Sequence, residues 1–180
     1  MAFPIPEVRM EQPTGRCLWF SGRAGAGKRT IAARVVTALR ADGLAVELLE
    51  RDSVREGLGL GPAPDGDDLG ADDRRLAWLA SRFAAHGVIA VVVGRSARRE
   101  PIEDARLTIR RFAEVFVDTP AELGQERSGE LDLAFEAPVH PELRVVTHDR
   151  TADASAAQVI SFLESGDLAA ESSTSAGRAG

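Results

Sequence analysis

Short apolar runs alternate along the chain with longer stretches in which apolar residues recur at helical spacing. Short runs of this kind are typical of buried strands, and the longer stretches are typical of helices with one buried face. Strands are predicted over residues 16–21, 45–49, 88–93, 113–117 and 143–146, and helices over 28–41, 72–86, 101–111, 120–127 and 152–164. This alternation predicts an α/β fold of three layers, with a mainly parallel five-stranded sheet between helices.

Three segments lack this periodicity. Residues 1–14 contain prolines and charges but no apolar stretch, so we interpret them as an N-terminal leader and not as a signal peptide. Residues 57–70 are rich in Gly, Pro and Asp, which predicts a surface loop, and residues 165–180 are rich in Ser, Ala and Gly, which predicts a disordered tail. We therefore expect one folded domain over 15–164.

Composition narrows the class of protein. The chain is 44% hydrophobic and 28% charged, and no run approaches the roughly 18 apolar residues that a membrane-spanning helix needs. A net charge of −6 argues against a nucleic-acid partner, whose phosphates require clustered cations. The single cysteine, Cys17, excludes an intramolecular disulfide and a cysteine-built metal site. A cytoplasmic protein without a membrane or nucleic-acid partner is expected.

The glycine-rich segment between the first strand and the first helix carries the strongest chemical signal. Glycines at such a turn let backbone N–H groups surround phosphates, the helix presents its positive N-terminal end, and the lysine reaches the β- and γ-phosphates. ATP is therefore the expected ligand. The residues predicted to bind it are Gly22, Ala24, Gly25, Ala26, Gly27, Lys28, Arg29 and Thr30.

Arg29 departs from the usual form of this loop, in which a Ser or Thr after the lysine holds Mg²⁺. Thr30 does not simply replace that hydroxyl, because adjacent helical residues point about 100° apart; it can instead contact a phosphate oxygen. A guanidinium cannot ligate a cation, but it can pair with phosphate oxygens. The sequence therefore predicts ATP binding with a weakened or absent Mg²⁺ site, and no residue is assigned as a certain metal ligand.

Five stretches occur in the order of the motifs of one kinase family: LWFSGRAGAGKRTIA at 18–32, LLERDSVREGLG at 48–59, DLGA at 68–71, VVVGRSARR at 91–99 and FAEVFVDTPAELGQERSGE at 112–130. From about Gly15 to Leu163 the chain resembles adenylylsulfate kinase. This family uses ATP to phosphorylate the 3′-hydroxyl of adenosine 5′-phosphosulfate in sulfate assimilation. The resemblance implies the P-loop kinase fold, a small sulfonucleotide as partner, and it leaves a homodimer open.

The resemblance also implies roles for individual residues. Lys28 and Asp52 would be catalytic, with Asp52 activating the ribose hydroxyl, and Arg127, at the start of the nucleotide lid, would bind the nucleotide. The implied substrate-binding residues are Asp52, Arg55, Arg74, Arg75, Ser96 and Arg99, of which either Arg74 or Arg75 makes the contact. The chemistry agrees, because a carboxylate at a strand end can orient a nucleophile and an arginine can clamp an anion. A solvated charged loop at 48–59 and an arginine-rich surface turn at 95–99 are the alternatives.

The segment after Arg127 is shorter than the family's nucleotide lid. A lid excludes water and brings reacting groups together, so its shortening is expected to weaken binding or chemistry. The leading hypothesis is a kinase that phosphorylates adenosine 5′-phosphosulfate. A nucleotide-binding regulatory protein without turnover and a kinase for another small acceptor are the alternatives.

Overall fold

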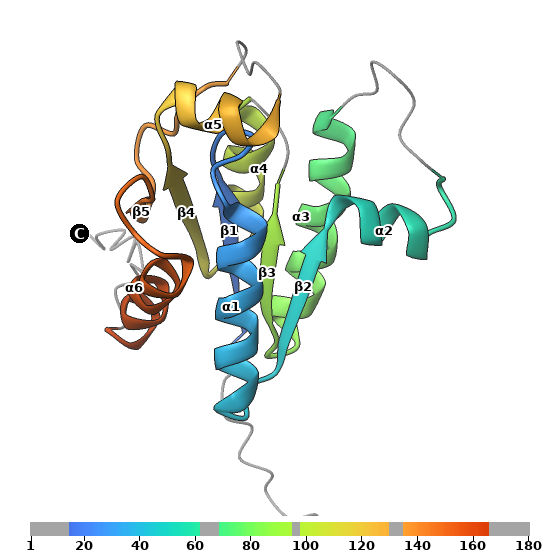
Figure 1. The fold of residues 1–180 in the computed structure, drawn as a ribbon. Coiled ribbons are helices and arrows are strands. Elements are labelled where there is room, and N and C mark those ends of the chain that lie inside the picture. Colours follow the sequence, from blue (N-terminus) through green and yellow to red (C-terminus); the bar gives the residue numbers. More distant parts are fainter. Residues whose placement is uncertain (1–14, 62–68, 95–97, 130–134, 166–180) are drawn as a thin grey trace, which may run out of the picture.

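The fold is a sheet of five parallel strands covered by helices on both faces (Figure 1). The computed structural model describes residues 15–61, 69–94, 98–129 and 135–165. In chain order the elements are β1 (Arg16–Ser21), α1 (Lys28–Ala41), β2 (Val46–Glu50), α2 (Arg51–Gly57), α3 (Leu69–Ala85), β3 (Ile89–Val93), α4 (Glu100–Thr108), β4 (Phe112–Asp118), α5 (Ala121–Ser128), β5 (Leu143–Val146) and α6 (Ala152–Glu164). This arrangement confirms the predicted fold class.

The strand order β2-β3-β1-β4-β5 puts β1 in the centre of the sheet, where it pairs in parallel with β3 and β4. The outer pairs, β2 with β3 and β4 with β5, are also parallel. All carboxyl ends of the strands therefore lie at one edge of the sheet. Ligands of open α/β sheets bind at that edge, beside the strands where the order of the chain reverses.

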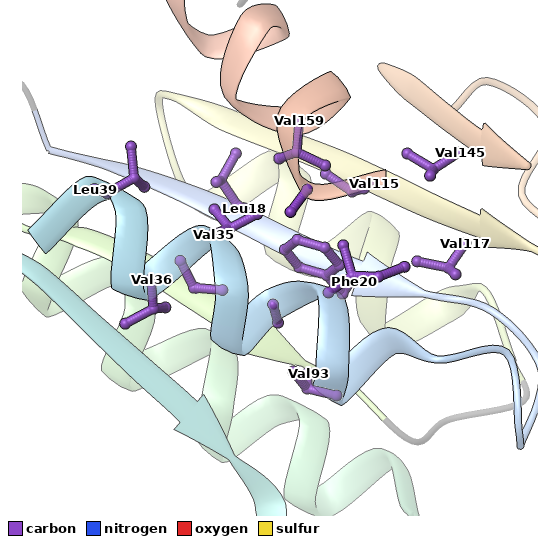
Figure 2. Packing of buried hydrophobic residues seen from close by; sticks show 14 of the residues in the cluster. Leu18, Phe20, Val35, Val36, Leu39, Val93, Val115, Val117, Val145 and Val159 are labelled. Atoms are coloured by element: carbon purple, nitrogen blue, oxygen red, sulfur yellow. The ribbon is translucent and has the colours of Figure 1, made fainter. Parts of the chain in front are cut away.

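Alternating residues of β1 divide the core into two layers. Leu18 and Phe20 pack with Val35 of α1 and Val159 of α6 in one layer, which Figure 2 shows. Trp19 faces the opposite layer, among residues of α3 and α4. Successive strand side chains point to opposite faces, so a central strand buried on both sides is apolar throughout. Because helices pack on both faces of the sheet, they fix the position of the edge at which the strands have their carboxyl ends.

The ends of several elements differ from the predictions. β1, α1, β5 and α6 have the predicted bounds, whereas β2 lies one residue later and α3 begins three residues before the predicted Asp72. α4 ends at Thr108, because Ile109 is already extended and β4 begins at Phe112. The predicted surface loop was wrong at both ends, since Gly57 belongs to α2 and residues 69–70 belong to α3.

The remaining predictions for segments without periodicity fall outside the described residues. These are the middle of the predicted loop, 62–68, the leader 1–14, and the tail from 166 onward. Within the ranges that the structure describes, no helix combines the length and the apolarity needed to cross a bilayer.

Cys17 offers a direct test of this core. Its side chain is fully buried in β1, and burial raises the pKa of the thiol far above its ordinary value. Because the thiolate is the reactive species, the folded protein is expected not to react with an aromatic disulfide reagent, and one thiol per chain is expected to react in denaturant. The release of chromophore, followed with Cys17→Ala as the blank, checks this. Fast reaction without denaturant would contradict the fold.

Candidate functional site

The glycine loop joins the end of β1 to the start of α1 at the carboxyl edge of the sheet. Gly22 has a φ of 139°, and a Cβ there would lie 2.3 Å from the carbonyl oxygen of Val117. Gly25 has a φ of 71°, and its Cβ would lie 2.3 Å from the carbonyl oxygen of Gly124. A side chain is excluded at both positions, by backbone conformation and by space. The glycines thus bring the loop backbone against β4 and α5.

Lys28 is the only lysine in the chain, and it folds back over this loop. Its Nζ donates hydrogen bonds to the carbonyl oxygens of Gly22, at 2.5 Å, and of Arg23, at 2.8 Å. The ammonium group therefore already lies within the loop, in reach of an anion that the loop encloses.

A cavity of about 350 Å³ lies in front of the loop. This volume is in the range of small-ligand pockets. Its lining includes seven of the nine residues predicted to bind nucleotide, all except Gly22 and Arg127, and the predicted catalytic carboxylate: Ala24, Gly25, Ala26, Gly27, Lys28, Arg29, Thr30 and Asp52. The structure thus brings the two predicted catalytic side chains, Lys28 and Asp52, to one cavity.

Two buried threonines support the loop from below. Thr147, which follows β5, donates through its hydroxyl to the carbonyl oxygen of Ala26 at 3.4 Å. The same hydroxyl is hydrogen-bonded to that of Thr119, which follows β4. The sequence analysis missed both threonines; their position directly after apolar strands was the available signal.

Arg29 points toward the end of β2. Its Nε donates a hydrogen bond of 2.5 Å to Glu50 Oε1, and its Nη2 lies 3.5 Å from Asp52 Oδ2. The hydrogen bond with Glu50 is the main cause that raises the pKa of Arg29, so the guanidinium is charged throughout the working range of pH. The sequence analysis did not identify Glu50 as its partner.

The loop differs at the position that ordinarily supplies a ligand to Mg²⁺. Mg²⁺ requires oxygen ligands in octahedral geometry. The position that normally supplies a hydroxyl carries Arg29, and the carboxylates of Glu50 in β2 and Asp52 in α2 already contact its guanidinium. Across the described ranges, no group of three or more His, Cys, Asp or Glu side chains could hold a metal ion.

A second charged group, the Asp72 cluster, consists of Asp72 with Arg51, Arg55 and Arg75. Arg55 Nη1 donates to both carboxylate oxygens of Asp72, at 3.0 and 3.1 Å, and Arg75 Nη1 donates at 2.6 Å. Arg51 Nε lies 3.4 Å from the same carboxylate. Asp72 is only 2% exposed and Arg55 only 7%, so the centre of this network is buried, whereas Arg75 lies at its exposed margin. The sequence analysis did not assign Asp72.

The cluster includes two of the predicted substrate-binding arginines, Arg55 and Arg75. Arg75 donates to Asp72, and its side chain, like that of Arg74 on the same helix, is exposed to solvent. Arg55 is bound by Asp72 and also donates to the carbonyl oxygen of Gly61 at 3.0 Å. To bind an anion as predicted, Arg55 would therefore have to divide its N–H donors between the anion and its partners in the protein, Asp72 and Gly61. Arg51 Nε lies 3.5 Å from Asp52, which links the cluster to the nucleotide cavity.

Arg127 and Arg99 are the other predicted residues among those that the structure describes. Arg127 is exposed in the last turn of α5, and its Cβ would be 3.2 Å from a Cβ at Gly25. Arg99 directly precedes α4, and its backbone N–H donates a hydrogen bond of 3.1 Å to Glu136, which lowers the pKa of that carboxyl. Ser96 lies outside the described residues.

The chain returns to the loop after the predicted short lid. The Arg23 guanidinium lies 4.8 Å from the centroid of the Phe135 ring, a distance typical of a cation–π contact. Phe135 also stacks on Phe116 of β4, with the ring centroids 6.1 Å apart. The sequence analysis did not assign Arg23 or Phe135, because only the fold brings them together. Residues 130–134 of this segment lie outside the described ranges.

Known proteins resemble this chain in sequence and in structure. The family model for adenylylsulphate kinase matches residues 14–131. An adenylyl-sulfate kinase of Deinococcus deserti is 35% identical over 150 residues, which cover 74% of this chain and 83% of that protein. One of Microcystis aeruginosa is 32% identical over 161 residues, covering 81% and 89%. The APS kinase of Mycobacterium tuberculosis, solved with AMPPNP and APS, superposes with a TM-score of 0.75 at 29% identity, covering 84% and 99%.

Proposed function

Since this chain belongs to the adenylylsulphate kinase family, we propose that it transfers the γ-phosphoryl group of ATP to the 3′-hydroxyl of adenosine 5′-phosphosulfate. The observation that carries this proposal is that Lys28 and Asp52 line one cavity in front of a glycine loop. A phosphate-binding cation and a carboxylate for the attacking hydroxyl are the two groups such a transfer needs close together. Family membership favours this kinase over a nucleotide-binding protein without turnover.

The loop and Lys28 would bind the nucleotide. The N–H groups of Gly25 and Gly27 and the N-terminal end of α1 favour negative charge at the cavity. Lys28 would exchange its bonds to the carbonyls of Gly22 and Arg23 for bonds to phosphate oxygens. Arg127, exposed beside Gly25, lies on the side of the loop where the predicted lid begins.

Asp52 would act on the acceptor. Its side chain is 60% exposed at the start of α2 and lines the same cavity. As the 3′-oxygen bonds to the γ-phosphorus, the bond from that phosphorus to the β,γ-bridging oxygen breaks and ADP leaves with its electron pair. The hydroxyl proton would pass to the Asp52 carboxylate and from there to water. Lys28 would stabilise the charge on the transferring group.

The Asp72 cluster would hold the anionic end of the acceptor. It lies next to Asp52 through Arg51, so a sulfonucleotide bound there would have its ribose near the carboxylate. Arginine is suited to this task because its planar guanidinium pairs with two oxygens at once. Asp72 would fix the orientation of Arg55 and Arg75 before the substrate arrives. For Ser96 and Arg99, a substrate-binding role at the same site stays a prediction.

Arg55→Ala is expected to raise the KM for the sulfonucleotide about tenfold or more, because a hydrogen bond to a charged group contributes about 1.5–3 kcal/mol. The Kd for ATP should change little. Arg75→Ala should have a larger effect than Arg74→Ala, since Arg75 contacts Asp72. Steady-state kinetics check this, with Arg82→Ala on the exposed face of α3 as the matched control. Wild-type KM values in both Arg55→Ala and Arg75→Ala would refute the acceptor site.

We further propose a cytoplasmic protein, because its one cysteine is buried and no helix of the described parts could span a membrane. No nucleic-acid partner is proposed, given the net charge of −6. A homodimer is the assembly to test first, by measuring the molar mass of the full chain in solution.

The proposed reaction is tested by ADP release from ATP in the presence of different acceptors. Adenosine 5′-phosphosulfate is expected to stimulate release, whereas adenosine 5′-monophosphate, which lacks the sulfate, and shikimate are expected to do so much less. Equal stimulation by all three, or none by any, would refute the assignment of the substrate.

A further inference from the structure

The phosphate loop carries a cation of its own at the position after the lysine. Arg29 lines the nucleotide cavity together with Lys28 and Asp52. Two carboxylates fix its guanidinium, Glu50 at 2.5 Å and Asp52 at 3.5 Å. The three side chains connect the first turn of α1 to the end of β2 and the start of α2, so neighbouring elements hold the charge in place.

The guanidinium is nevertheless accessible from the cavity. The Arg29 side chain is 65% exposed, whereas Glu50 is 18% exposed behind it. A guanidinium has five N–H donors in a planar fork, more than the contacts to Glu50 and Asp52 use. The remaining donors match the oxygens of a phosphate group, which arginine binds with two parallel hydrogen bonds.

A divalent metal ion beside the Arg29 guanidinium would be electrostatically disfavoured. The fixed guanidinium repels a second cation, and the carboxylates that would attract one are already neutralised by Arg29. The phosphates of the nucleotide carry negative charge, which a bound metal ion normally balances. Lys28 and Arg29 together supply two positive charges on the lining of one cavity.

We infer that the positive charge of Arg29 makes the site select the metal-free form of the nucleotide. This inference rests on the proposed kinase function. The Arg29 guanidinium pairs with the terminal phosphate oxygens of ATP or ADP in the place where other loops use Mg²⁺. Glu50 is the positioning residue, because it holds Nε and directs the rest of the fork toward the cavity.

The inference is tested by calorimetric titration of the full chain with ATP, once in EDTA and once in excess Mg²⁺. Wild-type protein is expected to bind with Kd values that agree within about threefold. Arg29→Ser supplies the missing hydroxyl and removes the charge, so its binding in EDTA should be about tenfold or more weaker than in Mg²⁺. Arg29→Ala supplies neither group and should bind weakly in both. Glu50→Gln should weaken binding in EDTA.

The matched control is Arg34→Ser, which removes an exposed arginine of α1 that pairs with Asp153, away from the loop. It should keep the wild-type values in both buffers. Wild-type binding that tightens tenfold or more on adding Mg²⁺, with Arg29→Ser unchanged from wild type, would overturn the inference. Metal-independent binding without phosphorylated product would keep the inference and refute the proposed function, whereas Mg²⁺-dependent binding with product would do the reverse.

Discussion

Lys28→Ala is expected to abolish measurable ATP binding. The loop offers one ammonium group, held over its own backbone by bonds of 2.5 and 2.8 Å, and no other lysine exists in the chain to replace it. Hydrogen bonds to charged groups contribute about 1.5–3 kcal/mol each, so the loss of two phosphate contacts corresponds to at least about a hundredfold in Kd. Calorimetry measures this directly.

The single lysine permits a second measurement on the same prediction. Reductive methylation with a ¹³C label places NMR signals on Lys28 and on the N-terminal amine alone. The Lys28 signal should shift on adding ATP, and the N-terminal signal should not. The far-ultraviolet spectrum and the denaturation midpoint of Lys28→Ala serve as controls for folding. Unchanged affinity in a folded variant would refute the assignment of the loop.

Asp52→Asn is expected to lower kcat about a hundredfold or more while the Kd for ATP changes by less than about twofold. A positioned proton acceptor contributes about 10²–10⁴ in rate, and an amide of the same shape cannot accept the proton. Arg29 keeps its shorter contact with Glu50 in this variant, so the loop should stay in place. Because Asp52 is largely exposed, folding should be little affected.

Single-turnover rates at saturating ATP and acceptor separate this effect from binding. Asp153→Asn is the matched control, since Asp153 is an exposed carboxylate that also contacts an arginine of α1. A single-turnover rate for Asp52→Asn equal to that of Asp153→Asn would show that the proton of the acceptor hydroxyl passes to a group other than Asp52.

The fold could be predicted because its central strands are apolar throughout. Leu18, Phe20 and Val91 belong to strands buried on both faces, so their runs are visible without knowledge of the partners. α6 begins at the predicted residue, directly after Thr151, whose hydroxyl accepts a hydrogen bond from the N–H of Ala154. α2 escaped prediction because its seven residues are mostly charged and are too few to show a helical period.

The candidate site was predictable only as far as local motifs extend. The loop from Gly22 to Thr30 combines neighbouring residues, and most of it lines one cavity. Its partners come from distant parts of the chain, Glu50 for Arg29 and Thr147 for Ala26. Such contacts depend on the order of strands in the sheet, which no local pattern reveals. The burial of Arg55 against Asp72 is of the same kind.

The most direct test of the proposed function is the identity of the product. ³¹P NMR of the full chain with ATP and adenosine 5′-phosphosulfate is expected to show a new phosphomonoester signal coupled to the ribose 3′ proton, with one ADP formed for each product molecule. Formation of ADP and inorganic phosphate alone, or a phosphoryl group on another atom of the nucleotide, would contradict the proposed reaction.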